Sequence, residues 1–219
     1  MYMSNHAINL LVLHTDAGRS ALEAVEAQVM NTQNAKPFLD LNRITPMPEE
    51  LKVDVDRYTY WRLHYFCLRS GQNVPRVDDK VRSVLLSALR NAPRSVEEYE
   101  EHSGFGAAEY NKGGKVFHNL QKYGFPDWYE WRLKFWGTKQ NALESDPAFH
   151  YWTSNDATIG FETAWEAPFQ AICALSAMHP DISFKLDTIY EGGEDDTIAT
   201  FRNGKRIMFR HEPGSLSER

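Results

Sequence analysis

The fold is first indicated by residues 129–139, whose sequence is Tyr-Glu-Trp-Arg-Leu-Lys-Phe-Trp-Gly-Thr-Lys. Polar and apolar residues alternate from Glu130 to Phe135, which is the period-2 pattern of a strand with one buried and one solvated face. Trp136 interrupts the pattern, and Gly137 frees the backbone to turn. The stretch therefore predicts a strand that ends in a turn, from which Thr138 and Lys139 project.

The N-terminal region predicts a β-α-β start. Ala7–His14 is short and almost wholly apolar, as is typical of a central strand. Asp16 offers an N-cap for a helix that runs to about Met30, because Leu22, Val25 and Val29 fall at helical spacing. Residues 38–44 return to strand character and are followed by two prolines.

The C-terminal region predicts further strands and one helix. Residues 159–165 alternate, a helix begins at Pro168 and runs to Met178, and residues 182–190 form a strand. Asn203-Gly204 separates residues 197–202 from residues 205–210, which is the strongest short sequence signal for a β-hairpin.

Residues between these two regions have helical periodicity, so the chain divides into a framework and an insertion. We expect one domain over residues 1–219, with a sheet framework at 1–48 and 128–212 and a helical insertion at 49–127. The element order predicts an α+β fold. In detail, we expect a ferredoxin-like β-α-β-β-α-β sandwich with a helical insertion and a C-terminal β-hairpin.

Composition limits the classes of function. The formal charge is −6, which argues against a protein that coats nucleic acid non-specifically. Cys67 and Cys173 lie far apart in apolar surroundings, which predicts buried free thiols and a reducing compartment. No apolar run is long enough to cross a bilayer and the start lacks secretory-signal features, so we expect a cytoplasmic protein without membrane partners.

Five segments stand in the order found in a known family. They are Asn5-His6, residues 42–51 (Asn-Arg-Ile-Thr-Pro-Met-Pro-Glu-Glu-Leu), residues 136–139 with Asn141-Ala142, residues 161–165 (Phe-Glu-Thr-Ala-Trp), and residues 190–193 (Tyr-Glu-Gly-Gly). Together they resemble the YubB-like family of plasmid and phage proteins, a group of unknown function with a ferredoxin-like domain. The resemblance implies a mobile-element origin and supplies no activity.

One candidate binding site lies at the predicted strand ends. An indole, a hydroxyl, a cation and an amide close to a glycine turn could hold an anionic or aromatic group. The alternative is that the tryptophans pack in the core and the lysine is solvated. The residues of this candidate site are Trp136, Thr138, Lys139, Asn141, Trp165 and Glu191.

A second candidate is the aromatic, arginine-rich start of the insertion, represented by Trp61, Arg62 and Tyr65. Centres of protein interfaces favour this composition, and the density of rings predicts that some reach the surface. The alternative is a helix that packs on its own domain. The same mixture could stack single-stranded nucleic acid, which the net acidity disfavours.

Catalytic and metal-binding motifs are missing from the sequence. The histidines lack the i, i+4 spacing of a helical zinc site, and no nucleophile or phosphate-loop fingerprint occurs. Glu194, Asp195 and Asp196 follow a glycine pair and are expected to solubilise an edge hairpin, not to bind metal. We therefore expect no cofactor and leave an enzyme open only through residues distant in sequence.

Three hypotheses for function result. The leading one is a non-enzymatic phage or plasmid accessory protein that binds a host protein or protein complex, such as a component of a defence system. The alternative is a small-molecule or nucleotide-binding domain, or an enzyme, with a site around Trp136 and Lys139. The third is nucleic-acid binding by the exposed face of the sheet, with affinity that falls steeply with salt.

Overall fold

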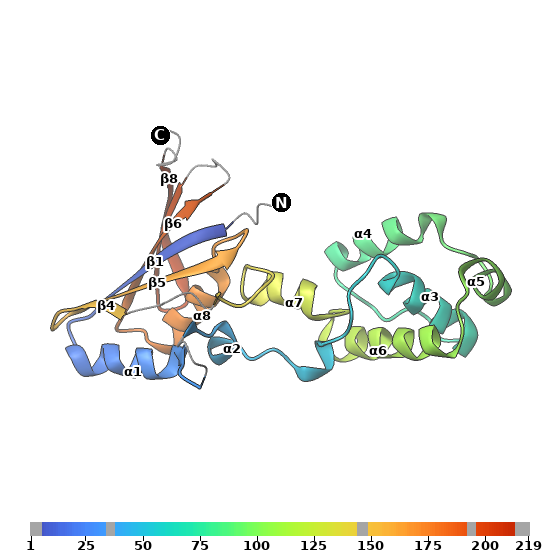
Figure 1. Ribbon diagram of the computed structural model, residues 1–219, viewed down its shortest axis with the longest axis horizontal. Helices are drawn as coiled ribbons and strands as arrows, with labels where there is room; N and C mark the ends of the chain where they lie inside the picture. Colours follow the sequence, from blue (N-terminus) through green and yellow to red (C-terminus); the bar gives the residue numbers. More distant parts are fainter. Residues whose placement is uncertain (1–5, 34–37, 144–148, 192–195, 213–219) are drawn as a thin grey trace. The chain divides into compact units, whose positions relative to one another are not determined.

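A computed structural model describes residues 6–33, 38–143, 149–191 and 196–212 (Figure 1). The chain forms two compact units, which are described separately. The first unit, the sheet unit, comprises Met1–Pro46 and Arg132–Arg219, and the second, the helical unit, comprises Met47–Trp131. The boundaries expected from the sequence lie after residues 48 and 127.

The sheet unit has a six-stranded antiparallel sheet in the order β4-β5-β1-β6-β7-β8. With α1 after β1 and α8 after β5, the first four of these strands make the β-α-β-β-α-β arrangement of a ferredoxin-like α+β fold, and the hairpin β7-β8 extends it. The elements are β1 (His6–His14), α1 (Arg19–Val29), β4 (Phe149–Trp152), β5 (Asp156–Ala164), α8 (Phe169–Met178), β6 (Ser183–Tyr190), β7 (Asp196–Arg202) and β8 (Lys205–Glu212).

The two faces of the sheet differ in their cover. Helices α1 and α8 lie on the same side of the sheet, and α8 contacts β6, β7 and β8 (Figure 1). On that side, every second residue of β1 is buried, namely Ala7, Asn9, Leu11 and Leu13. On the other face, Ile8 and Leu10 keep 41% and 43% of their surface exposed. The sheet therefore has one covered face and one open face.

A buried polar network crosses the covered face at its centre. Asn9 Nδ2 donates to Thr163 Oγ1 at 3.0 Å, and Asn9 Oδ1 accepts from Thr188 Oγ1 at 3.0 Å. The network joins β1 to both neighbouring strands and satisfies groups that are at most 1% exposed.

The predicted hairpin at Asn203-Gly204 is confirmed. Asn203 and Gly204 adopt φ of 48° and 71°, the left-handed values that an Asn-Gly two-residue turn supplies at low cost. The predicted helix at residues 168–178 and strand at 182–190 correspond to α8 and β6.

The predicted strand at residues 38–44 is wrong beyond its first two residues. Only β3 (Phe38–Leu39) is a strand, and it pairs with β2 (Met30–Asn31) in a separate two-stranded sheet. The chain then enters the short helix α2 (Leu41–Ile44). Asp40 causes the change, because its side chain caps that helix by accepting from the Asn42 amide at 2.9 Å.

The predicted strand over residues 130–135 is also wrong, because these residues belong to helix α7 (Trp128–Phe135). Asp127 Oδ1 accepts from the backbone amides of Tyr129 and Glu130 at 2.9 and 3.3 Å, so the carboxylate fixes the first turn. Six alternating residues are too few to outweigh such a cap. The second strand of the ferredoxin-like core is β4, which the sequence did not indicate.

The helical unit contains η1 (Glu49–Leu51), α3 (Thr59–Ser70), α4 (Asp79–Ala88), η2 (Leu89–Asn91), α5 (Val96–Ser103), α6 (Ala107–Tyr123) and the start of α7. Helices α3 and α6 approach closely at Gly113, where a Cβ would overlap the carbonyl oxygen of Arg62. An aliphatic cluster around Leu63 and an aromatic cluster of Tyr65, Tyr99 and Phe105 form its core.

The two cysteines are free thiols in different surroundings. Cys67 is buried in the aliphatic cluster, and burial raises the pKa of its thiol to about 11. Cys173 is only partly buried, so the prediction of two buried thiols is half right. None of the helices in the described part of the chain combines the length and apolar character that a membrane span needs.

Candidate functional site

Two residues of the strand-end candidate are structural. Trp136 is 1% exposed, and its Nε1 donates to the Thr45 carbonyl oxygen at 2.9 Å. Thr138 is fully buried, and its Oγ1 donates to the Ala164 carbonyl oxygen at 3.0 Å. Both side chains anchor the segment after α7 to the rest of the sheet unit. Neither is free to contact a ligand, which corrects the expectation that they form a surface site.

Asn141 also has a structural role. Its Oδ1 accepts from the Leu41 amide at 2.7 Å, and its Nδ2 donates to Asp40 Oδ1 at 2.7 Å. Asn141 therefore holds the start of α2 against a segment a hundred residues away in sequence. Its Oδ1 also accepts from the Ala142 amide at 3.0 Å, so the Asn141 side chain serves to hold the protein's own chain in place.

Lys139 and Trp165, in contrast, meet at the surface. Lys139 Nζ lies 4.6 Å from the centroid of the Trp165 ring, which is cation–π geometry. Trp165 is 51% exposed and has φ of 74°, a left-handed value that is unfavourable for a bulky residue. A large, exposed indole on a strained backbone calls for a functional explanation.

Glu191 lies at the same end of the sheet. His6 pairs with Ala164, and the His6 amide donates to Glu191 Oε2 at 3.2 Å. His6 Nδ1 also lies 3.2 Å from Glu162 Oε2. The structure thus brings Lys139, Trp165 and Glu191 to one end of the sheet. The other three candidate residues, Trp136, Thr138 and Asn141, have structural roles instead.

The candidate residues of the insertion are mostly buried. Tyr65 is fully buried in the aromatic cluster, and its hydroxyl donates to Glu100 Oε1 at 2.7 Å. Arg62 is 8% exposed and Trp61 is partly buried, with its Nε1 donating to the Ala88 carbonyl oxygen at 2.9 Å. The prediction that this group forms a contact surface is wrong for Tyr65 and Arg62, because Tyr65 lies inside the aromatic cluster and the Arg62 guanidinium is buried against Asp56.

The sequence predicts an exposed face of the sheet, but it does not identify the residues that form it. Its centre holds Ile8, Leu10 and Val12 of β1, flanked by Ile189 of β6, and Trp165 follows the end of β5 just beyond the His6–Ala164 pair. The available signal was the almost wholly apolar run Ala7–Leu13. In an antiparallel strand such a run makes both faces apolar, although only one face is covered here.

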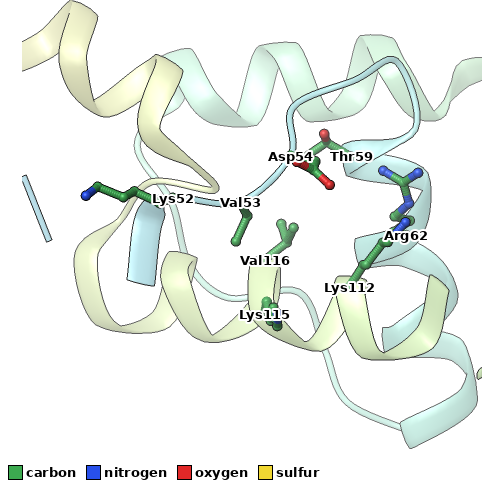
Figure 2. Close-up of a pocket in the computed structure, with 8 residues that line it drawn as sticks. All are labelled: Lys52, Val53, Asp54, Thr59, Arg62, Lys112, Lys115 and Val116. Carbon is green, nitrogen blue, oxygen red and sulfur yellow. The ribbon is translucent and has the colours of Figure 1, made fainter. Parts of the chain in front are cut away.

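A second missed feature is a cavity of about 160 Å³ within the helical unit (Figure 2). It lies between residues 52–54, α3 and α6. A larger groove of about 470 Å³ shares Lys52, Val53 and Lys115 with it. The sequence signal is the i, i+3 spacing of Lys112 and Lys115, which places both on one face of α6. The cavity is lined by Lys52, Val53, Asp54, Thr59, Arg62, Lys112, Lys115 and Val116.

The described residues contain no group of three His, Cys, Asp or Glu side chains placed to hold a metal ion. Glu194 and Asp195 of the acidic turn lie outside the described residues, as does Asn5.

Comparison with known proteins gives little. No family model matches the sequence, and no curated protein matches it. A similar solved structure is the crystal structure of a protein api92 from Yersinia pseudotuberculosis, described with the family model DUF1281. It is 10% identical, with coverage of 95% of this chain and 98% of that chain, and the TM-score is 0.44. A likeness of this degree carries no argument about function.

Proposed function

We propose that the protein acts by binding a protein partner through the open face of the sheet unit. The observation that supports the proposal is the exposure of Ile8 and Leu10, 41% and 43%, in the middle of the central strand. A contiguous exposed apolar surface rimmed by polar groups is typical of protein interaction sites. Trp165, 51% exposed at one end of this face, has the size and exposure of an interface anchor.

The chemistry of the face favours protein over nucleic acid. Among the described residues, the open side of β1, β5 and β6 presents mainly aliphatic, hydroxyl and charged groups, with the imidazoles of His6 and His14 at the two ends of β1 and no Phe, Tyr or Trp between them. The residues between are Ile8, Leu10, Val12, Thr158, Gly160, Glu162, Lys185, Asp187 and Ile189. Single-stranded nucleic acid is bound by stacking on rings over a positively charged groove. The exposed indole of Trp165 stands alone at one end of the face, and β6 has no excess of cations, since Lys185 lies 2.7 Å from Asp187.

The kind of partner is proposed from the mobile-element origin that the resemblance to the YubB-like family implies. On this proposal the chain is an accessory protein of a phage or plasmid. Its partner is then a host protein, for which a component of a defence system is our candidate.

The test is affinity capture from a host lysate with wild type, Leu10→Lys and Leu86→Lys. Leu10 and Leu86 are both exposed aliphatic residues, the second on α4 of the helical unit. A lysine at either position keeps an aliphatic stem and adds one charge, so the folded state of both variants is expected to persist. We expect Leu10→Lys to lose proteins that wild type and Leu86→Lys both retain.

Recovery of the same proteins in equal amounts by all three chains would contradict the proposal. Sedimentation velocity of the purified chains provides the parallel measurement. A wild-type dimer that Leu10→Lys dissociates would make the partner a second copy of the chain, and would overturn the host-protein part of the proposal while keeping the interface.

A further inference from the structure

Two aromatic side chains of the helical unit line a hollow at the junction of α3 with η2. Tyr58 and Trp61 pack against the aromatic cluster but are themselves only partly buried. The Trp61 hollow has a volume of about 360 Å³ and is lined by Arg57, Tyr58, Trp61, Ala88 and Asn91. Sites for small molecules have volumes of about 300–1,000 Å³ and combine apolar walls with a few polar groups. The Trp61 hollow meets both conditions.

The two rings of the Trp61 hollow are held in place by the protein. Their centroids lie 5.5 Å apart, with the ring planes inclined at 59°. Trp61 Nε1 donates to the Ala88 carbonyl oxygen at 2.9 Å, and the Tyr58 ring makes an edge contact with Phe105. Because the indole N–H is already used, a ligand in the hollow meets ring surface and not a donor. Such a surface suits a flat aromatic group.

Arg57 supplies a positive charge beside the rings. Its Nη2 donates to the Tyr58 hydroxyl at 2.6 Å, and its guanidinium carbon lies 4.7 Å from the centroid of the Tyr58 ring. The side chain is exposed, and no carboxylate of the described residues comes within 4 Å of it. Asp56, its neighbour in sequence, binds Arg62 with both carboxylate oxygens at 2.8 and 2.9 Å. The charge of Arg57 is therefore available to an anion from solution.

The short helix η2 supplies an amide and a second cation. Asn91 and Arg90 are both exposed, and within the described part of the chain neither side chain has a hydrogen bond or an ion pair. A carboxamide presents a donor and an acceptor side by side, which is how asparagine pairs with the edge of an adenine base. Arg90 adds to the positive charge of Arg57, since η2 carries no carboxylate of its own.

We propose that the Trp61 hollow binds a nucleoside monophosphate. The base lies against Tyr58 and Trp61, its polar edge pairs with the Asn91 amide, and its phosphate accepts charge-assisted hydrogen bonds from the Arg57 guanidinium. Each part of this ligand matches one observed group. Free phosphate would leave the rings without a contact, and a simple aromatic acid would leave the Asn91 amide without one.

The test is calorimetric titration of the full chain with adenosine monophosphate (AMP), and separately with adenosine and with ribose phosphate. We expect saturable binding of AMP, and binding that is weaker by roughly tenfold or more for each of the two partial ligands. The Leu10→Lys variant should bind AMP as wild type does. This inference concerns the helical unit, so it and the proposed protein interface can each fail alone.

Two variants separate the roles of the polar groups. Arg57→Gln should weaken AMP binding roughly tenfold and leave adenosine binding unchanged, which also shows that the ring walls persist. Asn91→Ala should weaken the binding of AMP and of adenosine, but not of ribose phosphate. The matched control for charge is Arg82→Gln on α4, an exposed arginine of the same unit without a described ion pair, for which we expect AMP binding within about twofold of wild type.

Three results would overturn the inference, namely no saturable binding of AMP, binding of ribose phosphate as tight as that of AMP, or an equal loss in Arg57→Gln and Arg82→Gln. A base and a phosphate also occur together at the end of a nucleic-acid strand. If a single-stranded oligonucleotide binds more tightly than AMP, with steep salt dependence and the same loss in Arg57→Gln, the assignment to a free nucleotide is wrong.

Discussion

The two units differ in where their apolar and charged side chains lie. The sheet unit leaves apolar groups uncovered at Ile8 and Leu10, while its charges pair locally, as in Lys185–Asp187 and Arg210–Glu212. The helical unit buries its rings and leaves Lys112 and Lys115 around a cavity. Apolar exposure suits a protein surface, whereas charged side chains of the helical unit pair with one another, as in Arg62–Asp56 and Lys122–Glu50. We therefore expect the sheet unit to supply the contact with a protein partner.

The two units also differ in what fixes their interior. In the sheet unit, Asn9 links three strands by side-chain hydrogen bonds. In the helical unit, a glycine permits close packing of two helices at Arg62. Substitutions at these places can show whether the units are stabilised independently.

Gly113→Ala is expected to have the largest effect. The new methyl group would overlap the Arg62 carbonyl and lie 2.9 Å from Phe66 Cβ, so α3 and α6 must move apart. The expected loss is about 3 kcal/mol of unfolding free energy in the helical unit, more than the ~1 kcal/mol that alanine gains over glycine in a helix. Hydrogen exchange read by mass spectrometry should show lost protection in α3 and α6 and none in β1 and β5.

Gly160→Ala is the matched control, because a Cβ at Gly160 meets no atom within 4 Å. Equal loss of protection in both units after Gly113→Ala would contradict the expectation that the two units are stabilised independently.

Asp127 predicts a pH dependence confined to the helical unit. Burial raises the pKa of its carboxyl to about 6, above the ordinary 3.8. The hydrogen bonds from two backbone amides lower the pKa, but burial has the larger effect. The folded state then holds the proton more tightly, so its stability falls as the pH rises from about 4 to about 6. The expected cost above pH 6 is up to about 3 kcal/mol.

Asp127→Asn keeps the cap acceptor and removes the titration. The variant minus wild-type difference in unfolding free energy should grow from pH 4 to pH 6 and then level off. A difference that is constant between pH 3.5 and pH 7 would show that Asp127 has an ordinary pKa.

Asn9→Ala is the counterpart in the sheet unit. It leaves the buried Thr188 hydroxyl without its acceptor and removes the bond to Thr163, for an expected loss of about 2 kcal/mol. Exchange protection should fall in β1, β5 and β6 and persist in α3 and α6. Thr200→Ala on the open side of β7 is the control. If Thr200→Ala loses as much unfolding free energy as Asn9→Ala, the buried network does not stabilise the sheet more than an ordinary hydroxyl does.

Some elements of the fold could be predicted from the sequence and others could not. The hairpin, α8 and β6 are decided by local signals, an Asn-Gly turn or a regular apolar period, and those predictions are confirmed. Residues 129–135 are helical because the carboxylate of Asp127 caps the helix. This cap has more influence than the short polar–apolar alternation that predicted a strand. The strand pairing of β4 depends on contacts with β5, which no local pattern encodes.

The candidate sites were harder to predict because burial is a property of the whole fold. Trp136 and Trp165 are the same residue type, and each directly follows a helix or a strand, yet one is 1% and the other 51% exposed. Tyr65 and Arg62 have the composition of an interface but form the core of the helical unit. Composition identifies residues that can bind, whereas only packing shows which of them are accessible.

Trp165→Gly is expected to have the smallest effect on stability, and one of opposite sign. At φ of 74° glycine is unstrained, and the relief of backbone strain, of the order of 1 kcal/mol, competes with the loss of the contact to Lys139, about 0.5 kcal/mol at an exposed site. Urea denaturation should therefore show a gain of up to about 0.5 kcal/mol or no change, while capture of a partner from the lysate falls. The strain at Trp165 is then retained for binding, as the apolar exposure of the sheet unit suggests. Lys139→Gln measures the loss of the contact with the Trp165 ring alone, because it leaves the backbone strain at Trp165 unchanged. If Trp165→Gly instead destabilises the sheet unit by 2 kcal/mol or more (roughly the loss expected for a buried ring), the indole is part of the fold and the open face loses its anchor.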